Sequence, residues 1–187
     1  MIARTDGREP PAAVRAILAA IDAACAVGAG VAAIAAAALA LILITEVIVT
    51  SFFEWSQPWA VEYPVYLQCV VLFCGAGWTL RQGGHIRVAV LMQALPPGAA
   101  RLLDMAGTVF AIGVIGFATW ALWQQWFRTL DFGSTSFYPM NTPLWLPQGL
   151  LTLGVTLLWL AFLARLTRLV LELPADLSAG LTGGGVE

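Results

Sequence analysis

The chain has 187 residues, of which 60% are hydrophobic and 11% are charged, and its formal net charge is −2. This composition excludes an ordinary soluble domain and indicates an integral membrane protein. Because the basic residues are not gathered in one patch, the charge gives no reason to expect a nucleic-acid partner, and none is predicted.

Before the first long apolar run, residues 1–22 contain the sequence PPAAVRAILAAID. In this sequence Val14, Ile17, Leu18 and Ile21 share one face of a helix, which predicts a short amphipathic helix at the membrane interface. The alternative is that the first membrane span simply starts early. The following run is about twice as long as the apolar part of a signal peptide and ends in LILITEV, so we expect an uncleaved span.

Four segments are long and apolar enough to cross a membrane. A transmembrane helix needs about 20 mainly apolar residues for about 30 Å of hydrocarbon. The predicted cores are residues 24–44, 65–80, 105–127 and 144–164. The second is short, and it reaches across only if Glu62 and Arg81 lie at the two headgroup levels. The predicted fold is therefore an all-α integral membrane protein with four transmembrane helices.

The basic residues predict the orientation of these spans. Eight of the nine flank the spans on one side: Arg4, Arg8, Arg15, Arg81, Arg87, Arg101, Arg165 and Arg168. The opposite side has only Arg128. Because basic flanks stay in the cytoplasm, both termini are expected there. The chain then divides into a cytoplasmic N-terminal segment (1–22), a four-helix transmembrane domain (23–171) and a flexible cytoplasmic tail (172–187).

The two loops on the opposite side are expected to be ordered. The first, FFEWSQPWAVEYPVY, contains Trp55, Trp59, Tyr63 and Tyr66, whose amphipathic rings suit the headgroup level. The second, STSFYPMNTPLWLP, contains three prolines, which stiffen the backbone.

Few side chains could carry chemistry. Cys25, Cys69 and Cys74 lie in or beside spans without the spacing of a metal site, so they are interpreted as small apolar residues. The only histidine, His85, could supply one axial ligand, whereas a haem held between helices usually needs two. We therefore expect no metal, no cofactor and no catalytic group, and the chain is not expected to be an enzyme.

Two acidic residues near span ends were considered for function. Glu46 lies just beyond the first span, and an acid within a span is usually functional. It is either an ion-carrying carboxylate or, as we favour, a paired glutamate at the interface. Asp104, at the start of the third span, complements the N-terminus of that helix.

Small residues mark two further positions. In the third span Ala106, Gly113 and Gly116 form a stripe that permits close approach of a neighbouring helix, from this chain or another. Gly83 and Gly84 lack the spacing of a phosphate-binding loop and instead allow a turn after the second span.

A resemblance to a known family rests on the segment PWAVEYPVYLQCVVLFCGAGWTLRQGGHIRVAVLMQALPPG. It resembles the core of the small membrane (Q-type) subunit of tripartite ATP-independent periplasmic (TRAP) transporters. The matching motifs are Trp59 and Glu62 (Trp-x-x-Glu), Gly75 and Ala76, Gly84 to Val88 (Gly-His-Ile-Arg-Val), and Leu95 and Pro96. The sequence PLWLPQGLLTLG is similar to the start of the fourth span in that family. The chain departs from the family pattern at Thr50, where an arginine is common, and at Ala89, where an acid is common.

The resemblance implies a role without ATP hydrolysis, in the bacterial inner membrane. A periplasmic solute-binding protein delivers an organic acid or similar solute, and a large membrane subunit imports it with an ion gradient, usually of sodium. The small subunit is then a scaffold, or stator, beside the large subunit. Trp59, Glu62, Arg81, His85 and Arg87 are expected to contact the partner or to anchor the chain in the lipid bilayer.

Two alternatives to this function remain open from the residues alone. The first is a small proton-coupled efflux antiporter with Glu46 as carrier, which would favour an acid nearer the membrane centre and less structured loops. The second is an anchor subunit of another membrane complex.

Overall fold

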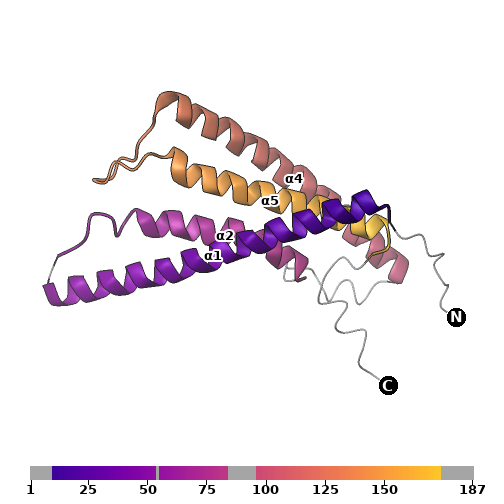
Figure 1. Cartoon of the computed structure of the whole chain (residues 1–187), viewed down its shortest axis with the longest axis horizontal. Helices are drawn as coiled ribbons and strands as arrows, with labels where there is room; N and C mark the ends of the chain where they lie inside the picture. Colours follow the sequence, from indigo (N-terminus) through magenta and orange to yellow (C-terminus); the bar gives the residue numbers. More distant parts are fainter. Residues whose placement is uncertain (1–9, 54, 84–95, 174–187) are drawn as a thin grey trace, which may run out of the picture.

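The computed structural model describes residues 10–53, 55–83 and 96–173, and this part of the chain is almost entirely helical (Figure 1). The helices are α1 (Ala12–Phe53), α2 (Tyr63–Arg81), α4 (Pro97–Phe132) and α5 (Trp145–Val170). All four are long and apolar enough to cross a membrane. The predicted all-α fold with four spans is confirmed, and the protein is a multi-pass membrane protein.

Two helices are much longer than their predicted cores, with 42 residues in α1 and 36 in α4. Counting uncharged residues finds only the part of a helix that suits hydrocarbon. The helices continue through Asp22, Glu46 and Asp104 because an acidic residue does not interrupt helical hydrogen bonding. The separate interfacial helix predicted before the first span is not present, since α1 is uninterrupted from Ala12. This matches the alternative of an early start.

The helices pack in the order α1, α2, α5, α4, and α5 also touches α1 (Figure 1). The most apolar window of α5 is 44% buried within the chain, compared with 17% for α1 and 11% for α4. Helix α5 is therefore the centre of the bundle. Helices α1 and α4 present large apolar surfaces to the surroundings.

Glycines bring the helix backbones into close contact around α2. A Cβ atom on Gly28 of α1 would lie 2.7 Å from the carbonyl oxygen of Cys74, and one on Gly154 of α5 would lie 2.8 Å from the carbonyl carbon of Phe73. Helices α1 and α5 therefore both pack closely against the backbone of α2, each at a glycine, where no side chain keeps the helices apart. Close packing of this kind is the main source of association between helices in lipid.

The small residues predicted to form a stripe on the third span lie in two different environments. Gly116 of α4 lies against the indole of Trp159 on α5, at 2.8 Å from a Cβ atom placed on the glycine. At Gly113 the same test meets no described atom within 4 Å. The close neighbour of this stripe is therefore α5 of the same chain at Gly116, and Gly113 faces outward.

The described residues of the two connections at one end of the bundle are held by hydrogen bonds, in agreement with the ordered loops predicted. Between α4 and α5 the chain forms a hairpin (residues 134–143), in which Ser136 N donates to the Thr142 carbonyl at 2.9 Å and Leu144 N donates to the Ser134 carbonyl at 3.0 Å. Gly133 ends α4 with a φ of 58°. Between α1 and α2 the loop folds back on α1 through Glu46. We call the end of the bundle that carries these two connections the loop end.

Candidate functional site

The opposite end of the bundle, the charged end, holds a cluster to which every helix contributes. The cluster consists of Asp22 on α1, Arg81 on α2, Asp104 on α4, and Arg165 and Arg168 on α5. One Asp22 oxygen, Oδ2, lies 2.7 Å from Arg168 Nη2 and 3.4 Å from Arg81 Nε. Asp22 therefore joins α1 to both α2 and α5.

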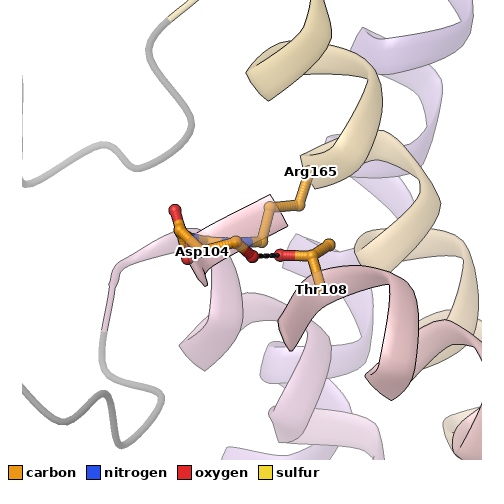
Figure 2. Close-up of polar contacts among 3 residues, drawn as sticks. All are labelled: Asp104, Thr108 and Arg165. Atoms are coloured by element: carbon orange, nitrogen blue, oxygen red, sulfur yellow. Dashed lines mark hydrogen bonds and ion pairs between the residues drawn. The ribbon is translucent and has the colours of Figure 1, made fainter. Parts of the chain in front are cut away.

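A third ion pair joins α4 to α5. Nη2 of Arg165 lies 3.1 Å from Oδ1 and 3.0 Å from Oδ2 of Asp104. Figure 2 shows the two side chains meeting between the helices, with Thr108 beside them. The Thr108 hydroxyl donates to the backbone carbonyl of Asp104 at 2.7 Å. Asp104 is therefore the partner of Arg165. Its predicted role at the N-terminus of the helix is wrong, because α4 already begins at Pro97 and has no acidic residue in its first turn.

The arginines of α5 are buried. Arg165 is 4% exposed and Arg168 is 5% exposed. A buried charge is strongly unfavourable unless it is paired, so the aspartates are needed to hold these arginines between the helices. The cavity in the cluster is about 10 Å³, which is room for about one water molecule. The charged end can therefore fasten the helices together.

At the loop end, Glu62 is the most deeply buried acid of the described residues. It is 1% exposed, and the Tyr66 hydroxyl donates to its Oε1 at 2.7 Å. Ser136 and Thr142 of the hairpin are also buried beside it. Burial raises the pKa of Glu62, but the hydroxyls of Tyr66, Ser136 and Thr142 outweigh this and hold the pKa below its ordinary value. Glu62 is therefore an ionised carboxylate beneath the hairpin.

The Thr142 hydroxyl lies close enough to Glu62 to lower its pKa, but no hydrogen bond of good geometry joins them. Glu62 Oε2 and Thr142 Oγ1 are buried atoms that make no hydrogen bond within the described residues. The position of Glu62 at the headgroup level stays a prediction. The structure adds that the Glu62 carboxylate is buried beside Ser136 and Thr142 of the hairpin between α4 and α5.

A seam of tryptophans joins α4 to α5 between the two ends. Trp123 Nε1 donates to Thr156 Oγ1 at 3.2 Å, and Trp126 Nε1 donates to the Trp145 carbonyl at 2.9 Å. The Thr129 hydroxyl donates to the Gln148 side-chain oxygen at 2.6 Å. A buried indole or hydroxyl needs such a partner, and each of these bonds fixes α4 relative to α5.

The five predicted site residues do not form one site. Arg81 lies in the charged cluster, whereas Trp59 and Glu62 lie at the loop end, where the Trp59 carbonyl accepts from Glu62 N at 3.2 Å. His85 and Arg87 lie outside the described residues. Sequence reasoning used Arg165 and Arg168 only for orientation and assigned no partner to Asp22. These ion pairs could have been suspected from the sequence, because acidic and basic residues of different predicted spans lie at span ends on the same side of the membrane.

Glu46 has two hydrogen-bond donors. Ser56 Oγ donates to its Oε1 at 2.7 Å, and Gln57 N donates to its Oε2 at 3.3 Å. These bonds hold the loop between α1 and α2 against α1. They support the interpretation of Glu46 as a paired glutamate over that of an ion carrier.

These features define a small four-helix membrane protein whose buried polar groups connect its own helices. Comparison with protein families then gives a match over residues 39–172 to the family described as tripartite ATP-independent periplasmic transporters, DctQ component. The chain belongs to this family, the small membrane component of TRAP transporters. A search of curated proteins and a search of solved structures each found no match.

Proposed function

We propose that this chain is the stator of a TRAP transporter. It supports a large ion-coupled membrane subunit that imports an organic acid or similar solute, delivered by a periplasmic solute-binding protein. The main support is the arrangement of buried charge at the charged end. There, ion pairs cross between helices and, among the described residues, enclose a cavity of only about 10 Å³.

A stator has to keep its shape while a neighbouring domain moves. Asp22 and Asp104 join all four helices at the charged end through their ion pairs. Farther along α4, hydrogen bonds from the tryptophan seam join α4 to α5. At the loop end, Glu62 holds the hairpin against the start of α2. Interactions at both ends oppose bending and sliding of the helices, which suits a fixed support.

We infer that the charged end is cytoplasmic and the loop end is periplasmic, in the bacterial inner membrane. The distribution of arginines supports this orientation. In this setting Trp59, Arg81, His85 and Arg87 anchor the chain or contact the large subunit. Glu62 acts by positioning the hairpin, which faces the compartment of the binding protein.

Co-purification tests this function. The chain is isolated with an affinity tag in mild detergent from its native membrane, and the accompanying proteins are identified. The expected result is a large, many-span membrane subunit in stoichiometric amount. The purified pair should transport solute in proteoliposomes with an imposed ion gradient and added binding protein. Recovery of a different complex, or full transport by the large subunit without this chain, would contradict the proposal.

A further inference from the structure

Helix α1 extends beyond the helices that flank it at the loop end (Figure 1). Along the contact between α1 and α2, Cys25 lies beside Gly77 and Gly28 lies beside Cys74. The two helices are therefore antiparallel, and moving three residues forward along α1 corresponds to moving three residues back along α2. Ala32 also lies beside Gly75. Together these contacts place the start of α2, at Tyr63, level with about residues 39 to 44 of α1.

Helix α5 begins at nearly the same level as α2. Gly154 of α5 packs against Phe73 and Cys74 of α2, and the two helices run in the same direction. By the same register, Trp145 is level with about residue 65. Residues 43–53 of α1, which we call the α1 extension, therefore continue for about 16 Å past the start of both neighbours.

The α1 extension exposes a broad apolar face. Ile44, Val47, Ile48 and Phe52 are between 49% and 79% exposed, and their spacing places them on one side of the helix. Glu46 lies on the other side, where the loop between α1 and α2 is hydrogen-bonded to it. The loop is therefore bound on the side of Glu46, and within the described part of the chain the apolar side stays exposed.

The hydroxyl groups of the extension are turned back onto the helix itself. Thr45 Oγ1 donates to the Leu41 carbonyl at 2.8 Å, and Thr50 Oγ1 donates to the Glu46 carbonyl at 2.7 Å. A hydroxyl that bonds its own helix in this way is suited to an environment without water.

Lipid cannot cover this face while α2 spans the membrane. The 19 residues of α2 measure about 28 Å, close to the hydrocarbon thickness of about 30 Å. Residues 23–53 of α1 measure about 46 Å, and immersing them would need a tilt of about 50°, beyond the usual range of up to about 40°. Since α2 packs along α1, the same tilt would leave α2 covering only about 18 Å.

We propose that the apolar face of the α1 extension, formed by Ile44, Val47, Ile48 and Phe52, is a docking surface for the large membrane subunit. This inference rests on the proposed function, which supplies that subunit as a permanent neighbour. A solute-binding protein that comes and goes would leave these side chains in water after each cycle, at a large hydrophobic cost. A permanent apolar interface has no such exposed state.

Site-specific photo-crosslinking tests the docking surface in the assembled transporter. A photoreactive phenylalanine analogue replaces Val47 in one variant and Val49, on the side of Glu46, in the matched control. After irradiation in membranes, Val47 should give a crosslink to the large subunit, and Val49 should give much less. Equal crosslinking from both positions would overturn the assignment of the face.

Other outcomes separate this inference from the proposed function. Crosslinks from Val47 only to the binding protein, to a second copy of the chain or to lipid would overturn the docking surface, while a co-purifying large subunit would leave the function intact. Absence of the large subunit from the wild-type preparation would contradict both. As a second measurement, V47D should lower recovery of the large subunit several-fold at an unchanged amount of the chain, and unchanged recovery would overturn the inference.

Discussion

Arg168, near the end of α5, donates a hydrogen bond of 2.7 Å to Asp22 on α1, although 146 positions separate the two residues in the chain. This contact joins the first helix to the last. Arg81 at the end of α2 approaches the same carboxylate oxygen at 3.4 Å. One aspartate therefore connects three of the four helices.

Replacing Asp22 with asparagine should destabilise the protein, because it removes the carboxylate from the buried Arg168. We expect a loss of about 2 kcal/mol, within the range for breaking one side of a charged hydrogen bond. Thermal unfolding of the purified chain in detergent measures it. E172Q is the matched control, since Glu172 pairs with Arg101 at the exposed surface and should cost less than about 1 kcal/mol. Equal unfolding temperatures for D22N and wild type would contradict the role of Asp22.

Exchanging the charges of Asp104 and Arg165 should show that they act as a pair. D104R and R165D alone each place two like charges together and should reduce recovery of folded protein. The double variant restores opposite charges and should recover part of the loss. Size-exclusion profiles of the three variants provide the measurement. A double variant as poorly recovered as the worse single variant would show that the two side chains act independently.

Glu62 should give a pH-dependent contribution to stability. Its pKa is lowered in the folded protein, so its stabilising effect is present above the ordinary glutamate pKa of about 4.3 and is lost as the pH falls through the lower folded value. E62Q should therefore unfold at a lower temperature than wild type at pH 7, and the difference should stay nearly constant down to about pH 5 and shrink as the pH is lowered further to about 3. A difference that stays constant over this whole range would contradict an ionised Glu62.

The same residue should control access to the hairpin. Chymotrypsin can cleave after Phe137, which is fully exposed near the hairpin tip; Tyr138 is followed by Pro139 and is not a cleavage site. Cleavage should be faster in E62Q, and T142V should give a smaller increase because it removes only one neighbouring hydroxyl. Identical cleavage rates in wild type and E62Q would show that the hairpin is held by other contacts.

Replacing a glycine with alanine adds one methyl group. The effect on stability should differ between a glycine in close contact with another helix and one that faces outward. G154A places a Cβ atom 2.8 Å from the backbone of α2, so it should force the helices apart and lower the unfolding temperature by several degrees. In G113A the new methyl group meets no described neighbour, and alanine favours a helix by up to about 1 kcal/mol over glycine. A G154A protein as stable as G113A would contradict the packing around α2.

The sequence was sufficient for the number and type of helices, because uncharged runs of about 20 residues have few other solutions in a protein this apolar. It also indicated ordered loops from the prolines between the third and fourth spans and the aromatic residues between the first and second. Helix ends were less accessible. Hydropathy detects the part inside hydrocarbon, whereas α1 continues over 42 residues.

The polar contacts could not be derived from the sequence, because each depends on which helices become neighbours. Asp22 and Arg168 are both near span ends, but only the packing of α5 against α1 brings them together. Glu62 was noticed for its place beside aromatic residues and for the family motif. Its burial depends on a hairpin that begins 72 residues later, at Ser134, and no local pattern specifies that contact.

The central claim is that this chain is a rigid support while its transporter works. Spin labels at Ala37 on α1 and Phe117 on α4, both exposed, would report the distance across the bundle in a complex whose native cysteines have been replaced. Double electron–electron resonance is measured on the reconstituted transporter at rest, and again with ion gradient and solute-loaded binding protein. A rigid support should give one unchanged distance distribution in both conditions. A second distance that appears only during transport would contradict the stator.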